Sequence, residues 1–313
     1  MYGPERKERF IRWYQPGKHR RESMYATFAM TEDLESRLSR DLAQLDMAEA
    51  KALMESLEFY SLRDLRLALD YCKEYASWCR SNGLFPASPG GFLLLRPGQV
   101  DPAPTIARTA FRSAGDLIAV LRSVRVWDRG YPEPPVLALA WLGLTQEEIL
   151  SLKEEDVDLD RETVTVGGRV AADGFPPELR PVLRACGAWD QAERDGPCGP
   201  YPVFRDRASP YFLKRMLPEG PSGNAGKPYG VSQISKAIAA MNRELAAAGK
   251  PPRLRFDAVW LSGRCRRLWE AEQAGADVTD PACRDLTERI FRRSMGFRKA
   301  IRLYEAYKRA FCL

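Results

Sequence analysis

One stretch of this chain holds too much proline and glycine to continue a helix or a strand. Residues 84–110 contain five prolines and three glycines, which remove backbone hydrogen-bond donors and add backbone freedom. The chain has 313 residues, more than one typical domain needs. We therefore predict a helical domain over 1–83, a linker over 84–110 and a second domain over 111–313.

Helices are predicted in the first domain from capping residues and apolar spacing. Thr31 and Ser61 each precede a sequence that is typical of a helix start. Apolar residues then recur at helical spacing over 62–78. Cys72 and Cys79 lie two turns apart on this predicted helix, and we expect them in the core.

The second domain is predicted to combine helices with a small hairpin. Thr145 followed by Glu148 matches a capping box, and Gly167-Gly168 is typical of a hairpin turn. The predicted elements are helices over 113–127 and 136–142, a helix after Thr145, strands over 162–166 and 169–172, and a helix after 178. The expected fold class is mainly α, with a small β-hairpin or sheet.

Histidine and cysteine limit the chemistry of the chain. His19 is the only histidine, and it lies in a basic run, where an exposed residue is expected. The seven cysteines contain no Cys-x-x-Cys pair. A disulfide framework and a metal centre are therefore not expected, and no cofactor is predicted.

Positive charge is concentrated late in the chain. The whole chain carries +6, from 48 Lys and Arg against 42 Asp and Glu. Residues 253–313 hold 14 basic and 8 acidic side chains, so this segment alone accounts for +6. Such a concentration favours a phosphate-binding surface, and the alternative is a solvated helix face. Acidic residues interrupt the run, so a membrane partner is not expected.

Several segments resemble the phage integrases, or tyrosine recombinases. Leu137–Asp158 is similar to their first conserved box, and the strand and turn up to Phe175–Glu178 are similar to the hairpin segment behind that box. Tyr75–Gly83 resembles the end of their core-binding domain. The resemblance implies a helical, SAM-like core-binding domain, then a mixed α/β catalytic-like domain, the two gripping opposite faces of a DNA duplex.

The residues that carry recombinase chemistry are replaced in this chain. The family has an arginine directly after Gly143-Leu144, where Thr145 stands here. In its His-x-x-Arg box, Val259 replaces the histidine and Ser262 the arginine, and Gly296-Phe297 replaces a later Gly-His. The family's hairpin lysine is also missing.

These losses matter because phosphodiester transesterification needs cations on the phosphate and a proton donor. We therefore expect a protein that is not an enzyme. The alternative is an active recombinase with a divergent site, in which Tyr304 or Tyr307 would be the nucleophile and Arg264 a supporting cation. The N-terminal Met1–Ile11, with 254–255 and 261–263, further resembles phage lytic-cycle repressors of the MrpR type, which are similar to recombinases without the catalytic set.

DNA contacts are predicted where cations and helix starts coincide. Ser232 is the expected N-cap of a helix whose first turns carry Gln233, and a helix start with a glutamine can bind phosphate and read adenine. The predicted DNA-binding residues are Lys214, Arg215, Ser232, Gln233, Ser235, Lys236, Arg264, Arg267, Arg298 and Lys299. The alternatives are an ordinary capped helix, a core-docked helix with basic tips at 211–215, ion pairing of Arg264 and Arg267 with Glu270 or Glu272, and a solvated charge run that includes Arg292 and Arg293.

The sequence thus predicts a sequence-specific DNA-binding protein, a phage or prophage repressor on an inactive recombinase fold. Its expected partner is double-stranded DNA, in the bacterial cytoplasm and nucleoid. The amphipathic segment 301–313, with Leu303, Phe311 and Cys312 on its apolar face, packs on its own domain or joins two protomers. A helical protein-interaction scaffold is the remaining alternative.

Overall fold

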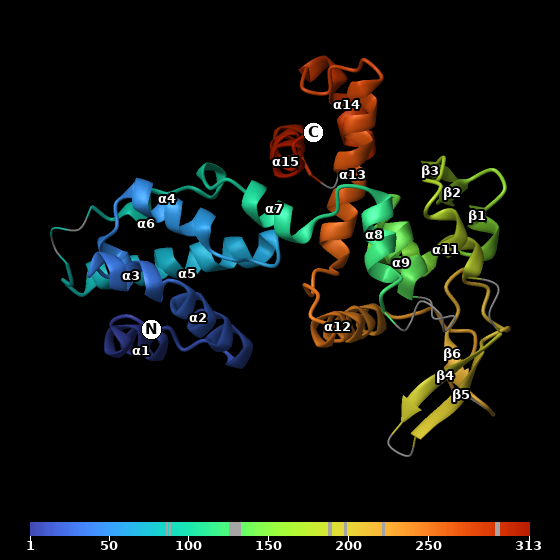
Figure 1. Cartoon of the computed structure of the whole chain (residues 1–313), viewed down its shortest axis with the longest axis horizontal. Helices are drawn as coiled ribbons and strands as arrows, with labels where there is room; N and C mark the ends of the chain where they lie inside the picture. The colour runs from blue at the N-terminus through green and yellow to red at the C-terminus, as the bar shows by residue number, and fades with distance from the viewer. Residues whose placement is uncertain are drawn as a thin grey trace. The chain divides into compact units, whose positions relative to one another are not determined.

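A computed structural model gives the fold of the chain. It describes residues 1–85, 87, 89–124, 133–186, 190–196, 199–220, 223–291 and 295–313. The chain divides into two compact units, 1–108 with 312–313, and 109–311. We call them unit 1 and unit 2 and describe each by itself (Figure 1).

Unit 1 is built from helices. They are α1 (Pro4–Tyr14), α2 (Lys18–Met30), α3 (Glu32–Leu38), α4 (Met47–Ser56), α5 (Leu62–Ser81), α6 (Gly91–Leu94) and α7 (Ala103–Thr109), with short 3-10 turns at Leu42–Gln44 and Pro97–Gln99. The predicted cap at Ser61 is confirmed, because its hydroxyl accepts a hydrogen bond from the Asp64 N–H. Cys72 and Cys79 are buried in the core, as expected.

Two ion pairs, one of them fully buried, join α1 to α3 and to Asp41 just after α3. Lys7 and Glu35 form a hydrogen-bonded pair, and both side chains are 0% exposed. Arg6 pairs with Asp41 at 3.2 Å, and the Tyr75 hydroxyl donates to the same carboxylate at 2.9 Å. Burial raises the pKa of Glu35, with Lys7 opposing the shift. These pairs fix α1 against the rest of unit 1.

The expected linker over 84–110 differs from the structure. Its residues form α6, a 3-10 turn and α7, and Phe92, Leu95 and Val100 lie in the core of unit 1. The glycines allow close approach instead of chain freedom: an added Cβ at Gly91 would lie 2.2 Å from the backbone of Asp46. The proline- and glycine-rich segment is therefore a folded part of unit 1 and not a linker.

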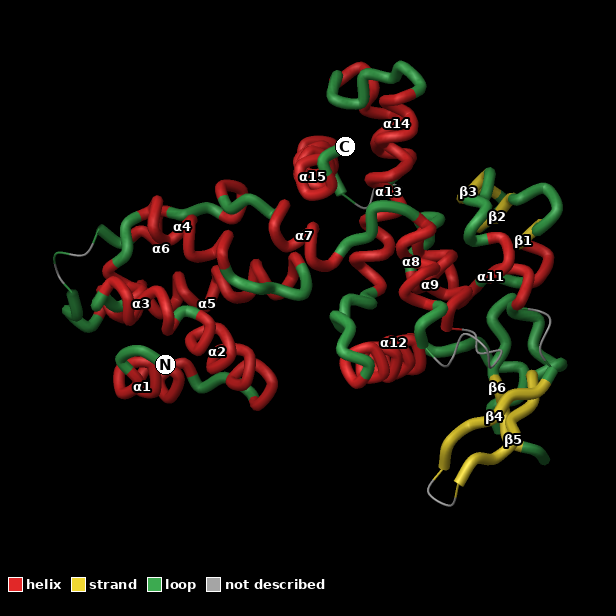
Figure 2. The backbone as a smooth tube through the Cα atoms, viewed as in Figure 1, coloured by secondary structure: helices red, strands yellow, loops and turns green. Residues whose placement is uncertain are grey.

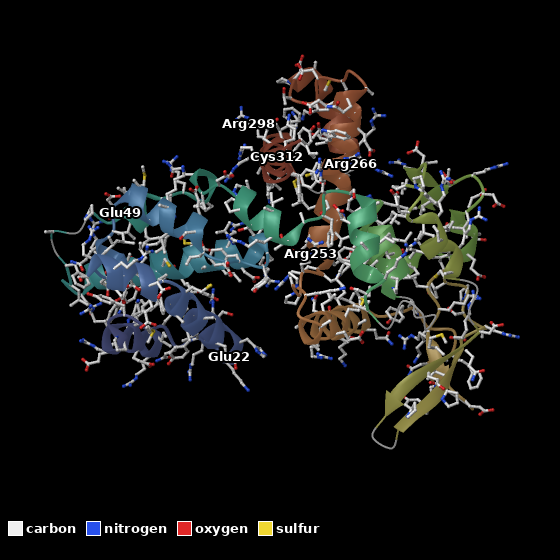
Figure 3. All side chains as sticks on the ribbon, in the orientation of Figure 1. Glu22, Glu49, Arg253, Arg266, Arg298 and Cys312 are labelled. Carbon is white, nitrogen blue, oxygen red and sulfur yellow. The ribbon has the colours of Figure 1, made fainter. Side chains whose placement is uncertain are left out.

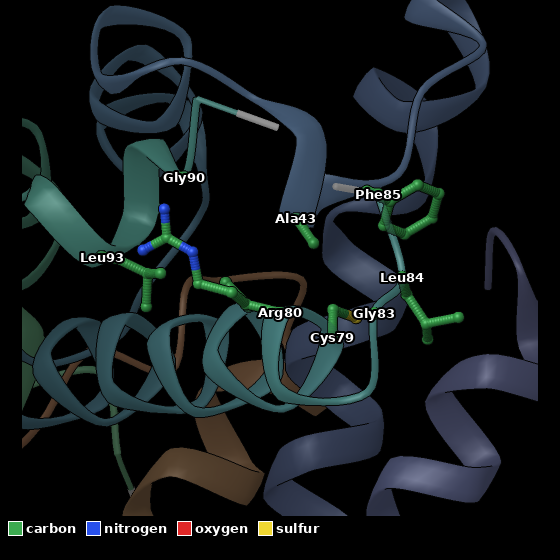
Figure 4. Close-up of a pocket in the computed structure, with 9 residues that line it drawn as sticks. Ala43, Cys79, Arg80, Gly83, Leu84, Phe85, Gly90 and Leu93 are labelled. Carbon is green, nitrogen blue, oxygen red and sulfur yellow. The ribbon is translucent and has the colours of Figure 1, made fainter. Parts of the chain in front are cut away.

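A small cavity lies between the end of α5 and α6. Its volume is about 210 Å³, and Figure 4 shows Ala43, Cys79, Arg80 and Leu93 around it. Burial raises the pKa of the Cys79 thiol to about 11. This thiol is therefore protonated near neutral pH.

Unit 2 mixes helices with two small sheets, which are separate in Figure 2. Its helices are α8 (Ala114–Leu121), α9 (Glu133–Trp141), α10 (Gln146–Ser151), α11 (Arg180–Ala185), α12 (Val231–Ala247), α13 (Phe256–Gln273), α14 (Arg284–Ile290) and α15 (Phe297–Phe311). Its strands are β1 (Val157–Asp158), β2 (Thr163–Val166), β3 (Arg169–Asp173), β4 (Gln191–Gly196), β5 (Gly199–Arg205) and β6 (Met216–Pro218). The expected fold class is confirmed.

The predicted capping box and the predicted hairpin of the first sheet are both confirmed. The Thr145 hydroxyl accepts from the Glu148 N–H, and the Glu148 carboxylate accepts from the Thr145 N–H, as predicted for a capping box. Strands β2 and β3 pair antiparallel around Gly167-Gly168, where both glycines have positive φ. The second sheet, β4–β5–β6, was not predicted from the sequence.

Helices α9 and α13 cross at very short range in the core of unit 2. A Cβ added at Gly263 would lie 1.8 Å from the carbonyl oxygen of Trp141. Gly263 is therefore the residue that lets the two backbones touch. The hydroxyl of Ser262 donates to the Ala258 carbonyl and accepts from the Phe111 N–H at 2.9 Å, which ties α13 to the start of the unit.

Candidate nucleic-acid interface

Helix α12 exposes small and basic side chains along one face. Ser232, Ser235, Lys236 and Arg243 are all exposed, and Ile234 and others on the opposite face are buried. The helix begins at Val231 with Gly230 as its N-cap, so the expectation that Ser232 caps it was wrong. The exposed face is open to a ligand.

The side chain of Gln233 caps the start of α12. Its side-chain oxygen accepts a hydrogen bond from the Gly230 N–H at 2.7 Å. Bidentate recognition of adenine needs both the oxygen and the nitrogen of the amide. In this arrangement one lone pair of the oxygen is engaged, so a base contact would have to use the second, and the predicted contact stays a prediction. The cause is the three-residue spacing, which suits a capping box.

Lys214 and Arg215 lie in the segment before β6 and bond within the unit. The Lys214 ammonium is 2.9 Å from the Glu154 carboxylate, and its side chain is 9% exposed. Arg215 donates to the Pro228 carbonyl at 2.8 Å. Arg205 reaches the same Glu154 at 3.2 Å. The expected DNA contact by Lys214 is therefore corrected: its charge is used inside the fold. The expected helix over 211–215 is also absent, since these residues form a bridge and loop.

Arg264 does not reach the surface of unit 2. Its side chain is 0% exposed, and its guanidinium donates to the Gly143 and Ile290 carbonyls. It also stacks on Trp260, with the guanidinium carbon 3.9 Å from the ring centroid. The predicted DNA contact by Arg264 was wrong, because helical spacing fixed its position on α13 but not the backbone groups around it.

The next two arginines of α13 are half-buried. Arg266 pairs with Glu270 at 3.0 Å and stacks on Trp269 at 4.0 Å, and Figure 3 shows Arg266 on this helix. Burial lowers the pKa of Arg267, while the Asp173 and Glu270 carboxylates oppose the shift. Arg267 thus faces carboxylates within its own unit, so its predicted role in DNA contact stays a prediction.

Helix α15 carries exposed cations at its start. Arg298 and Lys299 are exposed, and neither forms an ion pair with a described carboxylate. Figure 3 shows Arg298 on this helix. Arg302 and Arg309 are also exposed and come after Arg298 at helical spacing. The predicted cations Arg292 and Arg293 lie outside the described residues.

The two tyrosines of α15 are buried and bonded. Tyr304 and Tyr307 are both 0% exposed. Tyr304 donates to the Glu272 carboxylate, and the Tyr307 hydroxyl lies 2.7 Å from the Phe111 carbonyl oxygen. Burial raises the pKa of both phenols, and the bond to Glu272 raises that of Tyr304 further. A protonated, enclosed phenol is a poor nucleophile.

A basic surface that the sequence analysis did not assign to DNA binding lies in unit 1. The end of α1 and the start of α2 expose five cations, Arg9, Arg12, Lys18, Arg20 and Arg21, together with His19. Residues 9–21 contain no Asp or Glu. None of the five cations forms an ion pair with a carboxylate in the part of the chain that the structure describes. We call these residues, with Trp13, the α1–α2 surface.

Trp13 makes the α1–α2 surface aromatic as well as basic. It is 60% exposed, an unusual state for tryptophan. The guanidinium carbon of Arg20 lies 5.4 Å from the centroid of the Tyr14 ring, so this cation–π contact joins α2 to α1 at the surface. A run of thirteen residues with five cations and no acid was visible in the sequence. The net charge of residues 1–252 is zero, so a count over this whole region does not reveal the run.

Two kinds of site are not found in the described residues. None of their helices combines the length and the apolarity that a membrane crossing needs. No described group of three or more His, Cys, Asp and Glu side chains is arranged to hold a metal ion.

Comparisons with known proteins support the fold. Helices followed by a capped helix, a hairpin and further helices are the order that the tyrosine-recombinase resemblance implied. Residues 1–81 match the family model described as the N-terminal core-binding domain of MrpR. Residues 1–81 are therefore similar to the core-binding domain of MrpR, as the resemblance predicted for this part of the chain. No curated protein matches the sequence.

Solved structures of recombinases align along most of the chain. The crystal structure of XerA recombinase covers 99% of this chain and 97% of its own, with 14% identity and a TM-score of 0.42. The Tn1549 transposon integrase in complex with circular intermediate DNA covers 99% and 98%, with 12% identity and a TM-score of 0.36.

Proposed function

We propose that the protein binds double-stranded DNA through exposed cations in both units and represses transcription without cutting DNA. The observation that carries the proposal is the α1–α2 surface: five exposed cations without a carboxylate among residues 9–21. A surface of this kind attracts the phosphate backbone and releases counterions on binding. In unit 2, Lys236 and Arg243 on α12 and Arg298 on α15 supply further exposed charge.

Three features of unit 2 support the absence of recombinase chemistry. Tyr304 and Tyr307 are buried, and their hydroxyls are engaged. Arg264, the cation that would support them, is engaged with backbone carbonyls. A protein that keeps a DNA-binding fold without a usable nucleophile is suited to occupy a site, and occupancy of a promoter is enough for repression.

Salt titrations of binding test the DNA part of the proposal. Duplex fragments are first selected from the source genome, and affinity is then measured by fluorescence anisotropy at several salt concentrations. Each phosphate contact contributes about 0.9 to the slope of log affinity against log salt. We expect Arg12→Gln and Arg298→Gln each to lower the slope by about that amount.

Arg184→Gln is the matched control for this titration. Arg184 is exposed but already lies 3.3 Å from the Asp160 carboxylate, so its removal should leave the slope nearly unchanged. A wild-type affinity that does not depend on salt contradicts the proposed DNA binding, and so does an Arg184→Gln effect as large as that of Arg12→Gln.

A nicked duplex tests the absence of chemistry. Such a substrate traps the covalent protein–DNA adduct that a recombinase tyrosine forms. We expect no adduct from the wild type, and we expect Tyr304→Phe to bind DNA as the wild type does. An adduct that disappears in Tyr304→Phe or Tyr307→Phe would instead establish an active recombinase.

A reporter strain tests repression. The wild type should lower transcription from a selected site, and Arg12→Gln should restore that transcription.

A further inference from the structure

A large cavity opens in unit 2 beside α13. Its volume is about 620 Å³, within the range of pockets that hold small molecules. Its walls come from α13, the end of α9, α14, the start of α8 and the segment 173–178 after β3. These elements are far apart in the sequence but belong to the same unit.

The cavity has a cation inside and carboxylates around it. Arg267 lines it and is half-buried. Among the described residues, the guanidinium of Arg267 forms no hydrogen bond, whereas its neighbour Arg266 is bonded to Glu270. Asp173 and Glu178 also line the cavity, are exposed, and have no ion pair with a described cation. Arg266 and Glu270 also line the cavity, but they are paired with each other at 3.0 Å. Arg267 faces Asp173 and Glu270 without forming an ion pair with either. Its N–H groups and the Asp173 and Glu178 carboxylates can therefore still bond a ligand.

The rest of the lining is largely apolar. Leu142, Phe175 and Ile290 contribute to the walls, together with Ala271 on α13. Leu142 and Phe175 belong to the core of the unit, so these walls are fixed by packing. Apolar walls beside charges of both signs suit a ligand that carries both charges and an apolar part.

We propose that this cavity binds a small zwitterion with an apolar body, of the amino-acid class. The carboxylate of the ligand pairs with Arg267, its ammonium faces Asp173 and Glu178, and its side chain packs on the apolar wall. A plain anion would meet the two carboxylates, and a plain cation would meet Arg267. A molecule with both charges can pair with Arg267 and with these carboxylates at the same time. This inference does not depend on the proposed DNA binding.

Ligand-observed NMR on the full chain tests the proposal. The probes are free leucine, phenylalanine and tryptophan, each beside its N-acetyl and its amide form, which lack one charge. We expect at least one free amino acid to bind with a Kd below about 10 mM, and each blocked form to bind about tenfold more weakly. Arg267→Gln should weaken the free form about tenfold and remove its advantage over the amide.

Two variants distinguish binding in this cavity from non-specific binding elsewhere on the protein. Ala271→Phe fills the cavity without changing its charge and should abolish binding. Arg289→Gln removes an exposed arginine of α14 that does not line the cavity, and it should change nothing. Circular dichroism confirms that each variant is folded. The proposal is overturned if no free amino acid binds in this range, if free and blocked forms bind equally, or if Ala271→Phe binds as the wild type does.

Discussion

Replacement of Arg264 by alanine should destabilise unit 2 severely. The guanidinium of Arg264 donates to the carbonyl of Gly143, in the turn after α9, and to that of Ile290, at the end of α14. It also stacks on Trp260. One side chain thus connects three helices, and alanine can replace none of these contacts.

The magnitude depends on the groups that are left without partners. A buried carbonyl that loses its donor costs about 1–3 kcal/mol, and this applies fully to Gly143 and in part to Ile290, which is only partly buried. The lost cation–π contact adds up to about 2 kcal/mol. Alanine also removes the desolvation cost of the guanidinium. We expect a net loss of about 3–5 kcal/mol, a large share of the typical stability of a domain.

Hydrogen exchange in urea measures this loss for unit 2 alone. Peptides from α9 and α13 report the opening of unit 2, while peptides from α5 report unit 1 and should not change. Arg298→Ala, an exposed arginine, is the control and should stay within about 0.5 kcal/mol of the wild type. Arg264→Lys keeps the charge but cannot reach both carbonyls, so it should resemble Arg264→Ala. If Arg264→Ala stays within about 1 kcal/mol of the wild type, the bracing role of Arg264 is refuted.

Gly263→Ala should lower the stability of unit 2 by at least about 3 kcal/mol, because its Cβ would lie 1.8 Å from the Trp141 carbonyl oxygen; an unchanged melting temperature would show that the helices can separate freely. Tyr307→Phe should cost about 1 kcal/mol, because it removes the hydroxyl proton that the Phe111 and Arg112 carbonyls share, and it should leave DNA affinity unchanged, so a large loss of affinity in a folded variant would contradict the structural role. Iodoacetamide at pH 8 should label the exposed Cys312 and spare Cys72, because Cys72 is enclosed in the core and burial raises the pKa of its thiol. Peptide mass spectrometry would detect early labelling of Cys72, which would contradict its burial.

Local signals were sufficient for helix starts and for one hairpin. Ser61 and Thr145 cap helices as predicted, because a cap involves residues only three positions apart. Gly167-Gly168 specified the first hairpin for the same reason. The sheet β4–β5–β6 was missed because its strand β5 contains Pro200 and Pro202, and proline is a poor strand residue.

Contacts between residues far apart in the chain could not be predicted from local sequence patterns. Arg264 was placed correctly on a helix, but its burial depends on Gly143, 121 residues earlier. Lys214 likewise meets Glu154 only through the fold. Charge counts found the basic region of α15 and missed the α1–α2 surface, because acidic residues elsewhere in unit 1 cancel its charge in the sum.

The bond between Tyr307 and Phe111 has a consequence for biosynthesis. These residues are 196 positions apart, so the ribosome needs roughly 10–40 s to make the second after the first. The core of unit 1 lies between Phe10 and Val100 and can assemble during this interval. The apolar residues of α9, in contrast, have to wait for α12 and α13, which pack on it. The nascent chain therefore carries uncovered apolar surface for many seconds, and this interval is when unit 2 is most exposed to aggregation and most in need of a chaperone.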